Sequence, residues 1–99
     1  MAVYVDDAFR STAWGRWTGG GHLQADSTEE LHAFAEAIGL RRAWFQSRPG
    51  RPDRDHYDLT RDLREEALRA GAIAEPIKDG ILRRRAQRER QRADALPPA

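Results

Sequence analysis

Two histidines and several carboxylates of this chain stand beside repeated helix-start patterns, where side chains can do chemistry. Residues 26–39 and 58–71 share one pattern, in which Asp, Thr, an acidic residue, Leu, Ala and Gly recur 32 positions apart. His22 lies upstream of the first copy and His56 upstream of the second. A further carboxylate pair, Asp6-Asp7, follows the first apolar stretch, and two adjacent negative charges need compensation.

These residue types suit a divalent metal and a phosphate-containing ligand. Carboxylate oxygens with one or two imidazole nitrogens suit Mg²⁺, Mn²⁺ or Zn²⁺. We assign the metal to Asp6, His22 and Asp26. We assign catalysis to His56, as general base, and to Asp58, which could also hold metal or a substrate hydroxyl. The residues expected to line the ligand site are Asp7, Arg41, Arg42, Trp44, Gln46 and Tyr57. A metal-free general base is the alternative chemistry.

A structural explanation of the same residues stays open. Aspartate is favoured at a helix start because its oxygen accepts hydrogen bonds from backbone amides that lack partners. Asp26 and Asp58 could serve that purpose alone, and His22 and His56 could be ordinary hydrogen-bonding residues. We expect His32, beside the apolar stripe of its helix, to be structural.

The elements expected to position these residues are short. Residues 2–5 and 72–74 are typical of strands, 22–25 of an extended segment, and 43–46 of a buried strand or anchor. A capping box at Ser27 and Glu30 predicts a helix that ends at Gly39. A second helix, capped by Thr60 or Asp58, should end at Gly71 after the segment 56–59. A charged helix should cover 77–95, with a frayed end at 96–99.

This order of elements predicts a small α/β domain, with an α+β arrangement as the close alternative. If the strands are parallel, the ends of the strands and the starts of the helices share one edge of the sheet. The four carboxylates and two imidazoles would then converge there.

Two loop features have a functional and a structural interpretation. The triplet Gly19-Gly20-Gly21 could expose backbone amides to a phosphate, but it lacks the spacing and the Lys of a P-loop, so a linker is favoured. Trp14, Trp17 and Trp44 could stack on a base or sugar. In a domain of this size we favour their placement in or around the core.

The charge of the chain is unevenly distributed, although its net value is only +1. Residues 1–77 carry 10 basic and 13 acidic side chains, whereas residues 78–92 carry 7 basic and 2 acidic ones. We therefore expect a domain over residues 1–77 and a basic helical arm over 78–99. Within the arm, the candidates for nucleic-acid contact are Arg83, Arg84, Arg85 and Arg88. A solvated helix is the alternative.

The composition excludes several classes of protein. The 99 residues include no Cys, which rules out disulfides and thiolate metal sites and favours a reducing cytoplasm. The first seven residues lack the basic and apolar regions of a signal peptide. No apolar run approaches the roughly 20 residues that cross a bilayer, so no membrane contact is expected. No pattern in the sequence fixes the oligomeric state.

An ordered series of motifs resembles a known family. It comprises the opening Met-x-Val-Tyr-Val-Asp-Asp, the stretches 22–35 and 39–46, and His56-Tyr57-Asp58. Over about residues 1–75 the chain resembles short bacterial and phage proteins described as a domain of unknown function (number four thousand and thirty-one). The resemblance implies a compact domain and brings no established activity.

Two functions from different classes follow from these patterns. The first is a hydrolase-like domain that uses the Asp/His residues, a divalent metal and a phosphate-containing ligand. The second is a non-enzymatic interaction or regulatory protein, whose residues 78–92 contact nucleic acid or an acidic protein partner.

Overall fold

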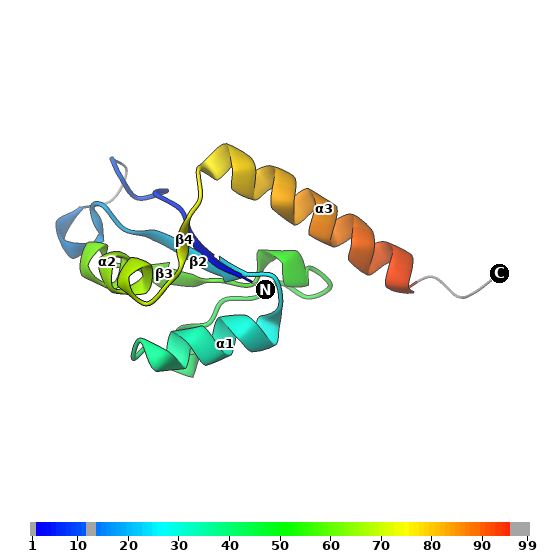
Figure 1. Ribbon diagram of the computed structural model, residues 1–99, viewed down its shortest axis with the longest axis horizontal. Coiled ribbons are helices and arrows are strands. Elements are labelled where there is room, and N and C mark those ends of the chain that lie inside the picture. The colour runs from blue at the N-terminus through cyan, green and yellow to red at the C-terminus, as the bar shows by residue number, and fades with distance from the viewer. Residues whose placement is uncertain (1, 12–13, 96–99) are drawn as a thin grey trace.

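The fold is a four-stranded mixed sheet between a layer of two helices and a single long helix (Figure 1). It is known from a computed structural model, which describes residues 2–11 and 14–95. The strands are β1 (Val3–Val5), β2 (Gly21–Ala25), β3 (Tyr57–Leu59) and β4 (Ile73–Ala74). The helices are α1 (Thr28–Ala37), α2 (Arg61–Arg69) and α3 (Ile77–Ala95), and three short 3₁₀ turns are η1 (Gly15–Trp17), η2 (Arg42–Trp44) and η3 (Pro52–Arg54).

The sheet has the order β3-β2-β1-β4, and only the pairing of β1 with β4 is parallel. The domain is therefore α+β, the second of the two predicted classes. The fully parallel sheet, on which the convergence at one edge was conditional, does not form, because β2 follows β1 through a loop and returns beside it in the opposite direction. Antiparallel strands can be joined in this way, whereas parallel neighbours need a longer crossover.

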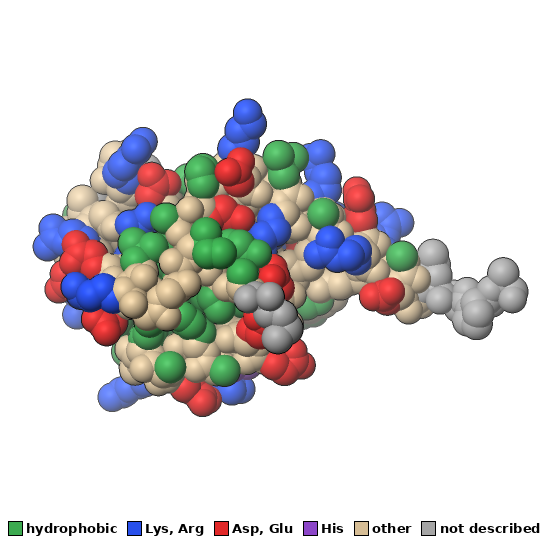
Figure 2. Space-filling view, viewed as in Figure 1, with side chains coloured by type: hydrophobic (Ala, Val, Ile, Leu, Met, Phe, Trp, Pro, Cys, Tyr) green, Lys and Arg blue, Asp and Glu red, His purple; other side chains and the backbone are tan. Residues whose placement is uncertain are grey.

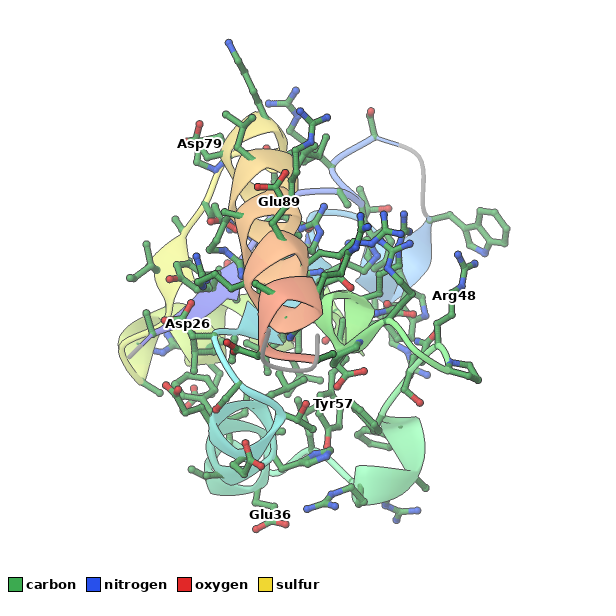
Figure 3. All side chains as sticks on the ribbon, turned by 90° about the vertical axis from the view of Figure 1, so that its right-hand side faces the viewer. Asp26, Glu36, Arg48, Tyr57, Asp79 and Glu89 are labelled. Carbon is green, nitrogen blue, oxygen red and sulfur yellow. The ribbon has the colours of Figure 1, made fainter. Side chains whose placement is uncertain are left out.

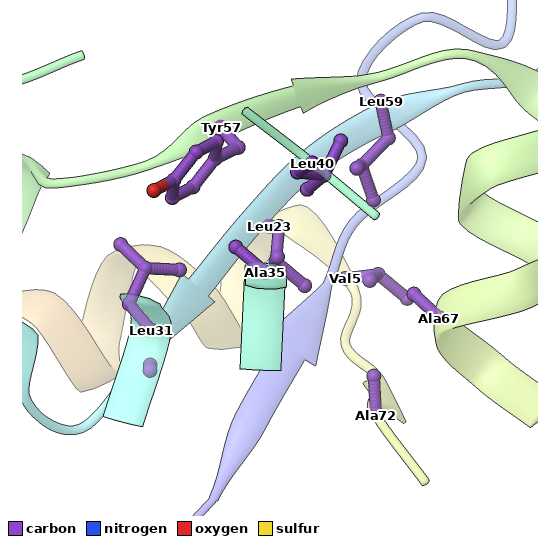
Figure 4. Close-up of a cluster of buried hydrophobic side chains, with 10 residues drawn as sticks. Val5, Leu23, Leu31, Ala35, Leu40, Tyr57, Leu59, Ala67 and Ala72 are labelled. Atoms are coloured by element: carbon purple, nitrogen blue, oxygen red, sulfur yellow. The ribbon is translucent and has the colours of Figure 1, made fainter. Parts of the chain in front are cut away.

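Alternation along the strands gives the sheet two different faces. Val5, Leu23 and Leu59 point to the face covered by α1 and α2 and are fully buried there, as Figure 4 shows. Tyr57 points the same way, and its hydroxyl hydrogen-bonds to His32 Nδ1 at 2.8 Å. Each such side chain stabilises the fold by roughly 2 kcal/mol through its removal from water.

The two repeated patterns end their helices in the same way. Gly39 and Gly71 have positive φ angles of 87° and 107°, which a residue with a Cβ adopts only at a cost. The amides after them bond back across the turn, from Leu40 to Ala35 and from Ala72 to Ala67. This arrangement is the Schellman motif, and the predicted ends of both helices are confirmed.

The starts of the two helices differ. Ser27 caps α1 and shares a capping box with Glu30, as predicted. Thr60 caps α2 by accepting a hydrogen bond from the amide of Leu63 at 3.2 Å. Asp58 is therefore not the cap of α2, because it lies within β3.

Of the two alternatives predicted for the segment 43–46, a buried strand or an anchor, the strand does not form. Residues 42–44 form η2, and Trp44 is 48% exposed. Gln46 alone pairs with a neighbouring segment, through a bridge to His56. Trp14 and Trp17 also remain exposed, so none of the three tryptophans belongs to the buried core.

Helix α3 crosses the second, more polar face of the sheet, and its final turns extend beyond it (Figure 1). Its bounds match the prediction, while the expected frayed end at 96–99 lies outside the described residues. Hydrophobic side chains reach the surface near β4 and the start of α3 (Figure 2), among them Ile73 and Ile77. Within the described part of the chain, no helix is long and apolar enough to cross a membrane.

Candidate functional site

Four of the predicted residues meet on the polar face of the sheet, near one end. In the register of β2 and β3, His22 lies directly opposite Asp58. His56 lies one step before β3 and pairs with Gln46. Asp6 follows β1, and its amide donates to the carbonyl of His22 at 3.2 Å. These side chains therefore come together through antiparallel strand pairing. They do not meet at the shared edge of a parallel sheet.

Asp6 is held from several directions. Its Oδ1 accepts hydrogen bonds from the amides of Ala8 and His22, at 3.0 and 2.8 Å. Its backbone carbonyl accepts a hydrogen bond from Nε of Arg64, on α2, at 2.8 Å. Gly21 permits this close approach, since a Cβ there would collide with the carbonyl oxygen of Asp6 and lie 2.6 Å from its Oδ1. Gly21, the last glycine of the triplet, is thus needed for close packing against Asp6. Neither predicted interpretation of the triplet, a phosphate-binding loop or a linker, included this role.

Both imidazoles are oriented through their Nδ1 atoms. Nδ1 of His22 lies 3.0 Å from Oδ2 of Asp6, and Nδ1 of His56 lies 2.8 Å from the carbonyl oxygen of Arg54. A carbonyl only accepts, so His56 carries a proton on Nδ1, and the carboxylate favours the same arrangement in His22. When both rings are neutral, each Nε2 therefore presents a lone pair.

Both Nε2 atoms point toward one carboxylate oxygen. Oδ1 of Asp58 lies 3.4 Å from Nε2 of His56 and 3.7 Å from Nε2 of His22. This oxygen is buried and, among the described residues, receives no hydrogen bond. The other oxygen, Oδ2, accepts a hydrogen bond from Gln46 Nε2 at 2.7 Å, which fixes the orientation of the carboxylate.

The dimensions of this triad (His22, His56 and Asp58) suit one small cation. Each residue offers a ligand atom within 4.8 Å of the other two. Tetrahedral Zn²⁺, with bonds of about 2.0–2.1 Å, separates neighbouring ligand atoms by about 3.3 Å. The observed separations of 3.4 and 3.7 Å are close to that value.

Protonation of the His22 imidazole competes with the binding of a metal ion by this ring. Its hydrogen bond to Asp6 raises the pKa of the His22 imidazole, against the opposing effect of burial. For Asp6, burial alone would raise the pKa, but the hydrogen bonds from His22 and Ala8 outweigh it and the pKa is lowered. The surroundings of His22 thus stabilise its imidazolium form relative to an imidazole in water.

Arginines surround the cavity beside the triad. This cavity, of about 330 Å³, is lined by Asp6, His22 and His56 together with Arg48, Arg54 and Arg84. Arg84 reaches it from α3 and donates to Oε1 of Gln24 at 2.7 Å. Burial lowers the pKa of its guanidinium, yet a guanidinium remains charged at neutral pH. The site therefore combines a possible cation position with anion-binding side chains.

Asp26 lies apart from this site. It follows the opposite end of β2, and four strand residues span about 13 Å. Its Oδ2 accepts a hydrogen bond from the amide of Ala2 at 3.0 Å and its Oδ1 one from the hydroxyl of Tyr4 at 2.9 Å. Figure 3 shows Asp26 and Arg48 on opposite sides of α3. The structure therefore does not bring Asp26 to the other residues, because it lies at the far end of β2 from His22.

Other predicted site residues also lie elsewhere. Asp7 is half-buried, and its Oδ2 lies 3.6 Å from Nη1 of Arg10. Arg42 pairs with Glu36 on α1 at 3.4 Å, and Arg41 stacks over the ring of Trp44. Tyr57 faces the opposite side of the sheet, because it precedes Asp58 by one position. Gln46 lies at the site, as an anchor for Asp58.

The arginines of α3 are not equivalent. Arg83 makes two hydrogen bonds to Glu75, at 2.8 and 3.1 Å, and its guanidinium lies 3.9 Å from the ring centre of Tyr4. Arg84 is turned toward Gln24, whereas Arg85 and Arg88 are exposed. The first two thus attach α3 to the sheet.

Sequence analysis missed Arg48, Arg54 and Gln24 as residues of this cavity. Arg48 and Arg54 lie between the expected elements 43–46 and 56–59, in a stretch for which no helix or strand was predicted. The close spacing of Arg54 and His56 was the available signal, but an arginine-rich loop is commonly solvated. Gln24 carried no signal apart from its position two residues after His22, on the same face of a strand.

Comparison with known proteins identifies a family for this chain. No curated protein and no solved structure matches it. A family model matches residues 3–89, and the match extends beyond residue 75, where the resemblance noted from the motifs ended, into α3. Because this match covers most of the sequence, the chain belongs to the family described as Protein of unknown function (DUF4031).

Proposed function

We propose that His22, His56 and Asp58 bind one divalent transition-metal ion, and that the site hydrolyses a phosphate ester. The observation that carries the proposal is the orientation of the two imidazoles. Histidine ligands of metals characteristically donate their other ring N–H to a carboxylate or a backbone carbonyl. Asp6 and the carbonyl of Arg54 are acceptors of these two kinds.

The ligand set favours Zn²⁺ or Mn²⁺ over Mg²⁺. Two imidazole nitrogens and one carboxylate oxygen suit the borderline transition metals, whereas Mg²⁺ prefers oxygen ligands and retains several waters. Three protein ligands also leave a coordination position for water or substrate, as catalytic zinc sites do. His56 is then a metal ligand, in place of the general base expected from the sequence.

The surrounding arginines support a phosphate-containing substrate. Arg48, Arg54 and Arg84 line the same cavity as the two imidazoles, and guanidinium groups bind phosphate through paired hydrogen bonds. A bound metal would lower the pKa of a coordinated water, so that hydroxide is available near neutral pH. The oxygen of this hydroxide would form a new bond to phosphorus while the bond from phosphorus to the ester oxygen breaks. The departing ester oxygen would take a proton from solvent.

The first test is thermal unfolding of chelator-treated protein with Zn²⁺, Mn²⁺ or Mg²⁺ added. A metal present at 100 times its dissociation constant stabilises the fold by about 2.7 kcal/mol. Zn²⁺ or Mn²⁺ should raise the midpoint of the wild type and not that of His56→Ala, and Mg²⁺ should have little effect. No rise in the wild-type midpoint with any of the three ions, relative to the metal-free protein, would refute the metal site.

Hydrolysis is tested separately, with a nitrophenyl phosphodiester as the substrate. The metal-loaded wild type should release nitrophenol, and Arg54→Ala should raise KM more than it lowers kcat, because its guanidinium is expected to bind the substrate phosphate. If metal binds but no nitrophenol is released by the loaded protein, the site is a metal site without this activity.

A further inference from the structure

The surface beside the triad continues into an aromatic hollow. This hollow, of about 580 Å³, is lined by Trp17, Trp44 and Phe45, and it also reaches Asp58 and Gln46. Trp17 is 36% exposed and Trp44 is 48% exposed. Large aromatic side chains are usually much more buried, so two exposed indoles on the wall of one hollow suggest a flat apolar ligand.

A basic hollow continues from the other side of the triad. It is lined by Arg51, Arg54, Arg84, Arg85 and Arg88, with Asp53. The Asp53 carboxylate is neutralised locally, since Arg51 donates to both of its oxygens at 3.0 and 2.9 Å.

The other guanidinium groups of the basic hollow keep their charge for a ligand. Among the described residues, Arg54, Arg85 and Arg88 form no ion pair within 4.0 Å. Arg85 and Arg88 are three positions apart on α3 and therefore project from the same side of the helix.

The three hollows lie next to one another and share lining residues. The triad cavity shares Gln46 with the aromatic hollow, and it shares Arg54 and Arg84 with the basic hollow. In the order of these shared residues, an aromatic platform comes first, then the candidate metal, then a run of positive charge. A ligand that matches all three parts must carry a flat ring, a phosphate ester next to it, and further negative charges beyond.

We infer that the substrate of the proposed site is a single-stranded nucleic acid. One base stacks on Trp17 and Trp44, the adjoining phosphodiester lies at the triad, and the following phosphates lie along Arg54, Arg85 and Arg88. This inference rests on the proposed function for the reaction, but the binding itself needs no metal. A paired duplex does not fit, because its bases are stacked on each other and unavailable to the indoles.

The arrangement predicts binding with little sequence preference. Base-to-indole stacking tolerates any base, and the arginines contact phosphates, which all nucleotides share. The contribution of base stacking to the affinity should be insensitive to salt. The contribution of the phosphate contacts should weaken with salt. A plot of the logarithm of the binding constant against the logarithm of the salt concentration should fall with a slope of about 0.7 for each phosphate contacted.

Binding can be measured by fluorescence anisotropy of a labelled oligothymidylate of about 12 nucleotides, in chelator so that no hydrolysis occurs. Trp44→Ala should weaken binding by about tenfold or more without changing the salt slope. The double variant Arg85→Ala/Arg88→Ala should weaken binding and reduce the slope by about 1.4.

Matched controls separate these effects from general changes in charge and folding. Trp14 is 84% exposed and does not line the aromatic hollow, so Trp14→Ala should bind like the wild type. Arg69→Ala/Arg90→Ala removes the same charge as the other double variant, from positions outside the basic hollow, and should leave the slope nearly unchanged.

The possible outcomes distinguish this inference from the proposed function. Metal-dependent stabilisation without oligonucleotide binding would overturn the nucleic-acid inference and leave the metal site intact. Binding that depends on Trp44 in a protein without metal affinity would support the nucleic-acid surface and refute the hydrolase. Equally tight binding of thymidine monophosphate, or of a duplex of the same length, would overturn the single-strand inference.

Discussion

Asp26 and Asp58 occupy matching places in the two repeated patterns, yet their surroundings differ completely. Asp26 accepts hydrogen bonds on both oxygens, from Tyr4 and from the amide of Ala2. Asp58 accepts one hydrogen bond, from Gln46, and turns its other oxygen toward two imidazole nitrogens. One carboxylate fixes the start of the chain against β2, and the other belongs to the candidate metal centre.

The difference arises from where each strand ends. Asp26 comes after the last residue of β2, whereas Asp58 lies inside β3 and faces His22 across the ladder. The repeated pattern specifies how each helix closes, through the shared geometry of Gly39 and Gly71, and says nothing about the strand before it. A repeated spacing can therefore encode two identical helix ends and two unrelated carboxylate environments.

Among the substitutions that separate the surroundings of Asp58 from those of Asp26, Gly21→Ala is expected to have the largest effect. The added Cβ would collide with the backbone oxygen of Asp6 and displace the residue that orients His22. We expect a loss of about 3 kcal/mol in the free energy of unfolding, measured in urea, together with loss of metal binding.

Gly15→Ala is the control for that variant. A Cβ at Gly15 meets no atom within 4 Å, although its φ of +62° gives the substitution a cost of about 1 kcal/mol. Equal losses of stability in the two variants would show that the close approach at Gly21 has no special importance.

Asp6→Asn should produce the next largest effect, and one that depends on pH. Asparagine keeps an acceptor for the amides of Ala8 and His22 but removes the charge-assisted hydrogen bond to the His22 ring. We expect a loss of about 2 kcal/mol in metal-free protein near pH 5 to 6.

The sign of this dependence follows from the two pKa shifts. The raised pKa of His22 means that its contribution is full below about pH 6.5 and declines as pH rises through the raised value. The lowered pKa of Asp6 means that its contribution is lost as pH falls below about 4. Urea titrations across this range should show the difference between variant and wild type narrowing at both ends, and a constant difference would contradict the pairing.

Tyr57→Phe tests whether the two faces of the sheet are independent. The variant removes the hydrogen bond between Tyr57 and His32 in the core, which should cost about 1 kcal/mol in stability. Zinc affinity should stay within twofold of the wild type, because the ring faces away from Asp58. A large loss of affinity, measured by calorimetric titration, would show that the core face and the site are coupled.

Asp26→Asn should have the smallest effect of these substitutions. The amide keeps one acceptor oxygen and loses the other at an exposed position, so the free energy of unfolding should fall by less than about 1 kcal/mol. A loss as large as that of Asp6→Asn would mean that Asp26 has a greater structural role than its two hydrogen bonds suggest.

Much of the fold could be predicted from local patterns. The capping box at Ser27, the two glycine helix ends and the bounds of α3 depend on neighbouring residues, and each is confirmed. The strand pairing could not be predicted in this way. Three-residue strands such as β1 and β3 carry too little pattern to fix direction, so the sequence left both a parallel and a mixed sheet open.

The candidate site was predictable as a set of residue types and not as a geometry. His22, His56 and Asp58 were identified from their places beside the two repeated helix-start patterns, and Asp6 as one of a carboxylate pair after the first apolar stretch. The roles of the two histidines depend on which ring nitrogen is hydrogen-bonded. For His56 this is set by the backbone carbonyl of Arg54, and for His22 by the carboxylate of Asp6. Neither contact has a signature in the sequence.

The central claim is that Asp58, and not its counterpart Asp26, belongs to a metal centre. Calorimetric titration of Zn²⁺ into chelator-treated wild type, Asp58→Asn and Asp26→Asn tests it directly. The account predicts one ion per wild-type chain, unchanged affinity in Asp26→Asn, and at least about 100-fold weaker binding in Asp58→Asn, since an uncharged amide replaces a direct ligand. Equal affinities in the two variants, or no binding to the wild type, would contradict it.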